Sequence, residues 1–493
     1  MENLSPLDTT KPDTFKQPKG LYLLFFTELW ERYGFYTVQT LLVLFLTKAF
    51  LFTDQQAYGL FGAFGALIYA TPVIGGYLAD KFLGFRKAIF FGGALFILGY
   101  LGLAFFYKTH WFYLALAFLI CGNGFFKSCV SSLLGELYKK NDIRRESGFT
   151  LFYMGINVGS FSASIFGAWV AVTYGWNYAF GMAAIGMCIG MLTLGFGKRL
   201  LEDKGLSPHH ATSNHKRYFG LNIDYFIYLT TIIVIIGISV LLHFYNIISW
   251  GMVLFSISVI AYLLYTATKL DKQQFNRMIA LIILLIFSVF FWALYFQMFM
   301  SSTLFIERVV NRHIGHWVIP TAMFQAIDPI SIIILSPLLS ALWLNLAKKN
   351  KNLSIPMKFS MGILFMALGF LLMSFAVTAT KMHNNISWIW VIIAFILQTI
   401  GELCLSPVGL AMITILSPRK LTGMLMGVWF LTLGAATATA GKIADFAAIP
   451  KNLTNPSQIA HVYSHTFAQF GIAGLLIAIF LISMTPWIKR LTE

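Results

Sequence analysis

Long uninterrupted runs of apolar residues, separated by short polar or charged breaks, dominate the chain. The runs reach about 20 residues or more, which is the length that an α-helix needs to cross the hydrocarbon core of a bilayer. They are continuously apolar rather than alternating, which excludes a transmembrane β-barrel. The pattern predicts fourteen spans, over residues 20–47, 57–79, 88–107, 111–135, 149–172, 178–197, 222–242, 248–268, 278–304, 318–346, 357–379, 387–416, 422–446 and 466–488.

The spacing of the predicted spans divides the chain into three parts. Six spans precede the longest polar stretch, residues 198–220, two follow it, and six more complete the chain. This layout predicts an all-α polytopic membrane protein with two six-helix bundles around a central polar site, which is the architecture of the major facilitator transporters. The expected parts are a first bundle, a cytoplasmic linker with two extra helices, and a second bundle, at residues 1–200, 201–277 and 278–493.

Composition excludes several classes of protein. Hydrophobic residues make up 58% of the 493 residues and charged residues only 11%, whereas soluble globular chains contain about 25% charged residues. A soluble enzyme, a disulfide scaffold and a disordered chain are therefore excluded. The four cysteines lie in apolar segments without metal-ligand spacing, and His209, His210 and His215 are interpreted as loop residues, so no metal site is predicted.

The distribution of basic residues predicts the orientation in the membrane. The chain has 35 Lys and Arg against 19 Asp and Glu, a net charge of +16. When the loops are assigned to alternate sides, 26 basic residues fall on the side of the N-terminus and seven on the other. The positive-inside rule then places both termini in the cytoplasm. Because the positive charge is spread over many short segments, nucleic acid is not expected as a partner.

Three charged residues occupy the first predicted span. A charge in the middle of the membrane costs about 3 kcal/mol on insertion scales, so each one needs an explanation. Glu28 and Arg32 are four residues apart on one helix face, and Glu31 lies on the same side. One interpretation is a structural ion-pair cluster. The other, which we favour, is proton handling, because two acids against one base leave an unbalanced carboxylate that a proton would neutralise.

Three further charges lie inside later spans. Lys127 follows two glycines in the fourth span, Gly122 and Gly124, which allow close helix approach, and it needs an anionic partner from the protein or a substrate. Glu402 precedes a Ser-Pro kink in the second half of the chain, and Asp328 precedes Pro329. A ligand with an amine and a carboxylate, such as a dipeptide about 7 Å long, would fit between Glu402 and Lys127. Asp328 has an alternative interpretation as a local cap at a helix break.

Several stretches resemble motifs of the proton-dependent oligopeptide transporters. Glu28-Leu-Trp-Glu-Arg-Tyr-Gly-Phe-Tyr36 resembles the E-x-x-E-R-F-x-Y-Y signature of that family, and Gly75-Gly-Tyr-Leu-Ala-Asp-Lys81 resembles the G-G-x-L-A-D loop of facilitators in general. Residues 149–160 resemble the F-Y-x-x-I-N-x-G-S stretch, and residues 401–409 with 426–430 resemble the tenth and eleventh core helices. The resemblance runs from about residue 20 to 445 and includes the two extra helices typical of bacterial members.

The resemblance implies two bundles that rock around a central site and import di- and tripeptides together with protons. By position, it assigns proton coupling to Glu28, Glu31 and Arg32, with Lys127 as their partner. The residues expected to contact the peptide are Tyr36, Gln39, Tyr69, Lys127, Asn157, Trp292, Asp328, Glu402, Ser406 and Trp429. No cofactor is expected besides the coupling proton.

Three positions depart from the family pattern. Gln39 stands where the family often has an arginine that binds the peptide carboxylate, and Phe296 stands where an acid is usual. Asp328 stands where the family usually has asparagine, so one carboxylate is lost and one is gained. We predict that Asp328, without a nearby cation, is protonated at neutral pH and takes part in proton coupling. The alternative is that it binds the peptide amine.

Other functions remain open at this point. The same fold could carry another zwitterion or an anion, such as an amino-acid derivative or nitrate, with protons. A membrane-embedded transferase is a further alternative, but the phosphate- or metal-binding spacing that an enzyme would need is missing from the sequence. The expected setting is a monomer in the bacterial inner membrane, whose partners are peptide, protons and lipid.

Overall fold

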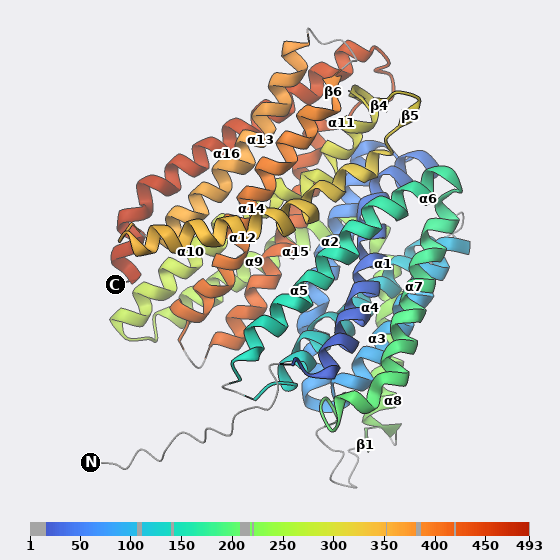
Figure 1. Ribbon diagram of the computed structural model, residues 1–493, viewed down its shortest axis with the longest axis vertical. Coiled ribbons are helices and arrows are strands. Elements are labelled where there is room, and N and C mark those ends of the chain that lie inside the picture. The colour runs from blue at the N-terminus through green and yellow to red at the C-terminus, as the bar shows by residue number, and fades with distance from the viewer. Residues whose placement is uncertain are drawn as a thin grey trace.

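A computed structural model describes residues 16–105, 111–139, 142–207, 217–218, 221–351, 353–380, 386–418 and 421–492. The histidines of the predicted polar loop, His209, His210 and His215, lie outside these residues. The chain is almost entirely helical (Figure 1). Within the described residues, sixteen α-helices form fourteen long segments, because short π- or 3₁₀-helical turns join two pairs of helices end to end.

The first half of the chain contributes helices α1 to α7. Their bounds are α1 (Lys19–Ala49), α2 (Asp54–Leu78), α3 (Phe85–Phe105), α4 (Trp111–Glu136), α5 (Arg144–Ser162), α6 (Ala168–Thr173) and α7 (Trp176–Gly197). Helix α1 packs against α5 and α7, and α4 packs against α2 and α3. A π-helical turn over 163–167 joins α5 to α6.

The second half contributes helices α10 to α16. Their bounds are α10 (Lys272–Tyr295), α11 (Ser301–Val309), α12 (Ile327–Lys348), α13 (Ile355–Ala379), α14 (Trp388–Leu416), α15 (Thr422–Ala444) and α16 (Pro456–Thr492). Helix α13 lies between α14 and α16, and α10 contacts all three. Short 3₁₀ turns over 296–299 and 321–326 precede α11 and α12.

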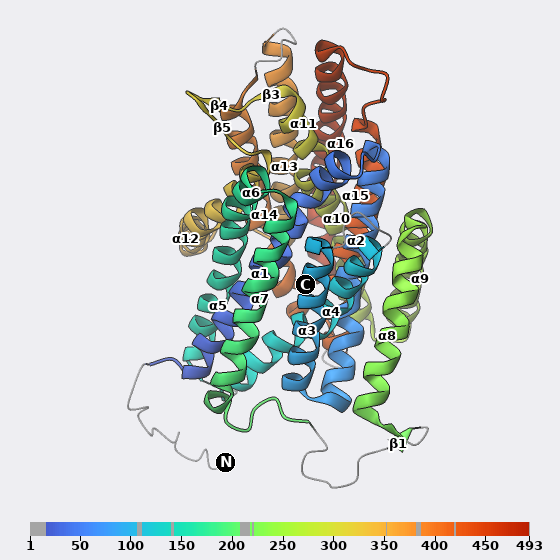
Figure 2. The same ribbon diagram turned by 90° about the vertical axis from the view of Figure 1, so that its right-hand side faces the viewer.

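Two helices stand apart from both groups. Helices α8 (Ile223–Leu242) and α9 (Tyr245–Ala267) lie along one side of the molecule (Figure 2), α8 against α4 and α9 against α15, α2 and α10. In the 18-residue apolar stretch of each of these two helices, only 22% is buried inside the protein, compared with 72% in α4. Large apolar side chains such as Ile233 and Trp250 are exposed on them, which suits contact with lipid.

The predicted spans agree with the helices. In the described part of the chain, thirteen segments are long and apolar enough to cross a membrane. The fourteenth long helix, α1, has 31 residues and carries five charged residues, three of them in its middle, but it is buried along most of its length. The all-α fold class predicted from the apolar runs is therefore confirmed.

The strands are pairs of two-residue segments outside the helices. They pair as β1 (Arg217–Tyr218) with β2 (Leu221–Asn222), β3 (Val310–Asn311) with β6 (Ile386–Ser387), and β4 (His313–Ile314) with β5 (Trp317–Val318). The β4–β5 pair is a hairpin, and Gly315 has a φ of +59° in its two-residue turn, a backbone conformation that favours glycine.

Glycines let helices approach closely within and between the two halves. A Cβ atom at Gly75 of α2 would lie 2.1 Å from the carbonyl oxygen of Gly124 in α4. This contact confirms the structural role predicted for the glycines before Lys127. Between the halves, a Cβ atom at Gly62 of α2 would lie 2.9 Å from the carbonyl oxygen of Thr437 in α15.

The two halves are joined near the loop between α1 and α2. Arg308 of α11 forms two ion-pair contacts with Asp54 of α2, at 2.6 and 2.7 Å, and Lys48 of α1 lies 2.5 Å from Glu307 of α11. Further along the same interface, the rings of Phe61 and the 3₁₀-turn residue Phe299 stack. Figure 1 shows the two groups of helices diverging away from this end of the molecule.

Candidate functional site

Helix α1 holds a buried charge cluster at mid-length. The guanidinium group of Arg32 forms two hydrogen bonds with the Glu31 carboxylate, and its Nε atom lies 3.5 Å from Glu28 Oε1. Glu28 and Glu31 are fully buried, and Arg32 is 5% exposed. The helical spacing of the three residues brings them together as predicted, because residues four apart share one face of a helix.

Lys127 of α4 completes this cluster. Its Nζ atom lies 2.8 Å from Glu28 Oε1, so its anionic partner is a protein carboxylate of this cluster, as the family resemblance implied. Two acids now face two bases, and the expectation of an unbalanced carboxylate in the cluster is wrong. The physical reason is that helix packing brings the second base from a position 99 residues away. Glu28 Oε2 is buried and has no hydrogen-bond partner in the described part of the chain.

The second half contains a site of opposite character. Asp328, in the first turn of α12, accepts hydrogen bonds from the Tyr295 hydroxyl at 3.1 Å and the Thr399 hydroxyl at 2.9 Å. Its carboxyl group also lies within hydrogen-bonding range of the Glu402 carboxyl group on α14. Asp328 and Glu402 are 7% and 9% exposed, and among the described residues neither forms an ion pair with a base.

The geometry at Asp328 bears on the alternative of a local cap. The helix does change at this point, because the 3₁₀ turn gives way to α-helix at Ile327. The Asp328 side chain nevertheless accepts its hydrogen bonds from residues of α10 and α14 rather than from the backbone of the break. Asp328 therefore connects three helices of the second half.

Tyrosines of the first half face the acids of the second. Tyr36 and Tyr153 lie within electrostatic range of both Asp328 and Glu402, and Tyr69 lies within range of Glu402. The ring of Tyr69 is 5.7 Å from that of Phe296, which occupies the position of the missing acid. The structure thus brings the predicted residues Tyr36 and Tyr69 to the same place as Asp328 and Glu402.

Four of the other predicted peptide-binding residues lie on the helices already described, and the fifth, Trp429, lies on α15. Trp292 packs against Tyr295, and its buried indole nitrogen has no partner among the described residues. The Asn157 side-chain amide donates to the carbonyl oxygen of Tyr153, and Ser406 lies one helical turn after Glu402. Gln39 and Trp429 are 6% and 3% exposed, and within the described part of the chain no hydrogen bond joins either side chain to an acid.

Three residues of this region were missed from the sequence. Tyr153, Tyr295 and Thr399 contact or face the acids but were not predicted as site residues. Thr399 could have been found, because it precedes Glu402 by three residues and so lies on the same helix face. Tyr295 carries no such signal, because its partner Asp328 lies 33 residues away.

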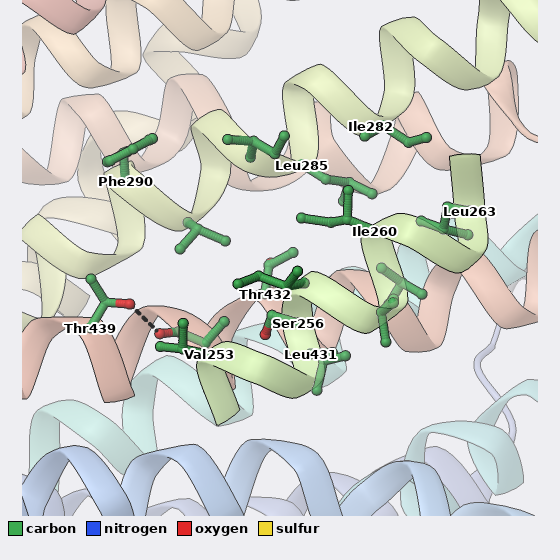
Figure 3. A pocket seen from close by; sticks show the side chains of 16 residues that line it. Val253, Ser256, Ile260, Leu263, Ile282, Leu285, Phe290, Leu431, Thr432 and Thr439 are labelled. Carbon is green, nitrogen blue, oxygen red and sulfur yellow. Dashed lines mark hydrogen bonds between the residues drawn. The ribbon is translucent and has the colours of Figure 1, made fainter. Parts of the chain in front are cut away.

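A separate apolar pocket of about 240 Å³ lies between α9, α10 and α15 (Figure 3). Its hydroxyl groups are bonded within their own helices: Ser256 donates to Met252, Thr432 to Trp429 and Thr439 to Ala435. The pocket therefore presents an apolar wall beside the extra helix α9, and its lining includes none of the residues predicted to couple protons or bind peptide.

Two groups of membrane helices, each with buried charged residues in its interior, are typical of secondary transporters. A family model described as "POT family" matches residues 86–460. Dipeptide and tripeptide permease A of Yersinia pestis is 35% identical over 97% of this chain and 94% of its own length. Dipeptide and tripeptide permease B of Salmonella typhimurium is 33% identical over 98% of both chains.

Solved structures agree with these sequence matches. The crystal structure of a peptide transporter POT in complex with sulfate has a TM-score of 0.83 and 28% identity, over 97% of this chain and 96% of the other. The chain therefore belongs to the POT family of transporters, as its motifs had indicated, and it is not an enzyme.

Proposed function

We propose that the protein imports di- and tripeptides together with protons by alternating access of a central site to the two sides of the membrane. The observation that carries this proposal is the buried acid pair Asp328 and Glu402, which forms no ion pair with a base among the described residues and lies within electrostatic range of tyrosines of the other half. Such a site suits the ammonium group of a peptide. The names of the related permeases support peptides as the substrate class.

The proposed division is a first bundle at 1–200, a linker with two extra helices at 201–277 and a second bundle at 278–493. We infer that both termini are cytoplasmic and that the membrane is the bacterial inner membrane, in keeping with the excess of basic residues on that side. In this orientation the end joined by Asp54 and Arg308 faces outward. One chain supplies all these residues, so a monomer suffices for transport.

The two charge sites have different proposed roles. Glu28, Glu31, Arg32 and Lys127 couple transport to protons, because protonation of a glutamate would release a base from its ion pair. Glu402 binds the peptide amine. Lys127, released from Glu28, would bind the peptide carboxylate in place of the arginine that is absent at Gln39.

Purified protein in liposomes tests this function. An inward proton gradient with an inside-negative potential should drive accumulation of a labelled dipeptide, and unlabelled di- and tripeptides should compete while single amino acids should not. Accumulation of an amino-acid derivative or nitrate without dipeptide uptake would overturn the proposal.

A further inference from the structure

Asp328 and Glu402 are two like charges placed together in the interior of the protein. They come from different helices, α12 and α14, and their carboxyl groups are within hydrogen-bonding range of each other. Two adjacent buried carboxyl groups cannot both ionise without strong repulsion, and the cheapest relief is one proton held between them. The arrangement is specific to this pair, because the Glu28 and Glu31 carboxylates are each compensated by a base.

The groups around the pair do not supply a compensating charge. The groups within electrostatic range of one or both acids are the hydroxyl groups of Tyr36 on α1, Tyr69 on α2, Tyr153 on α5 and Tyr295 on α10. Arg32 is the base within range of Tyr36 and Tyr69, but it is bound to Glu31. A proton or a substrate ammonium group must therefore neutralise the pair.

The hydroxyl groups allow the pair to gain and lose a proton. Thr399 Oγ1 lies 2.9 Å from Asp328 and also 2.9 Å from the carbonyl oxygen of Phe395. Its single hydrogen can point to Asp328 Oδ1 or turn to the carbonyl. Asp328 can therefore keep accepting this hydrogen bond, or release it, as the carboxyl group gains or loses a proton shared with Glu402.

We propose that Asp328 and Glu402 hold one proton between them and that the peptide ammonium group binds to this singly charged pair. This inference rests on the proposed function and adds to it a count of the charges on the acid pair, the proton and the peptide. The ionised pair carries two negative charges, which one proton and one ammonium group together neutralise. A peptide with a second ammonium group on its N-terminal side chain would replace the proton, which then leaves to water.

The test compares norleucyl-alanine with lysyl-alanine, which differ by one side-chain amine that is charged at pH 7. Proton exchange on binding is counted with a pH indicator in weakly buffered detergent solution. Both peptides bind to the same free protein, so the protonation state of the free pair cancels in the comparison. The complex with norleucyl-alanine should hold one proton more than the complex with lysyl-alanine. In Asp328→Asn the difference should vanish, because a single carboxylate binds one ammonium group without a proton.

Controls separate the possible failures. Glu402→Gln also breaks the pair and should abolish the proton difference, so it serves if Asp328→Asn does not fold. Ser360→Ala removes a buried hydroxyl that bonds only the backbone of α13, and it should keep the difference. If both peptides bind the wild type with equal proton counts, the shared proton is overturned while peptide binding stands. If neither peptide binds or is transported, the proposed function itself fails.

Discussion

The two halves of the molecule compensate their buried charges in different ways. In the first half, Glu28 and Glu31 are matched by Arg32 and Lys127 in direct ion pairs. In the second half, Asp328 and Glu402 face each other and hydroxyl groups. Because a buried charge must be compensated, the first cluster is complete without a ligand and the second is not. The comparison indicates that the second half needs a proton or a substrate charge to balance its acids, whereas the first half must rearrange its ion pairs before a charge becomes available.

The largest expected effect comes from breaking the balanced cluster. Glu31→Gln leaves Arg32 without its bidentate partner, and removing one member of a buried ion pair costs about 3–5 kcal/mol. Peptide uptake driven by a proton gradient in liposomes should fall more than about a hundredfold. Exchange of peptide across the membrane without a gradient is the control, because it needs no net proton movement. Gradient-driven uptake at the wild-type rate would contradict the coupling role.

The second prediction breaks the acid site. Glu402→Gln removes a desolvated charge that is proposed to pair with the peptide amine, at a cost of about 2–5 kcal/mol. Binding of a free dipeptide should weaken by at least about thirtyfold, whereas binding of its N-acetylated form should change little. Calorimetry on both ligands measures the difference. Equal losses would show that Glu402 does not bind the amine.

A third prediction concerns the ion pair that joins the halves at the proposed outer end. Asp54 is 4% exposed and is held by Arg308, so Arg308→Gln should destabilise the closed outer end by about 1–3 kcal/mol. Cysteines placed at Phe61 and Phe299, whose rings stack at 6.4 Å, should then cross-link more slowly. Lys48→Gln is the matched control, because Lys48 is 49% exposed and its pair should matter less. An unchanged cross-linking rate in Arg308→Gln would refute the role of this pair.

The smallest effect is expected where an ion pair is exposed. Lys87 of α3 pairs with Asp224 of α8, and the Lys87 side chain is 47% exposed. Exposed pairs contribute about 0–1 kcal/mol, so Lys87→Ala should leave uptake unchanged and should shift thermal stability only slightly. Melting curves of the purified protein measure this. A large loss of stability would show that this exposed ion pair holds α8 to α3. The assumption that only buried charges matter, on which the comparison of the two halves rests, would then be wrong.

The sequence determined the fold class and the charged residues of the site. Runs of about 20 apolar residues can be satisfied only as membrane helices, because the bilayer core offers no other partner for the backbone. Glu28, Glu31 and Arg32 could be grouped because helical spacing alone puts them on one face. The motifs around these residues and around Glu402 also indicated the family correctly.

Tertiary structure decided which charges meet. Lys127 reaches Glu28, and Asp328 reaches Thr399 and Glu402, across helices that are far apart in sequence. Spacing along one helix fixes neighbours only within that helix, whereas the rotation and packing of several helices fix all the others. For this reason the sequence named the acids and bases of the site, but only the folded chain showed that the first set is neutral and the second is not.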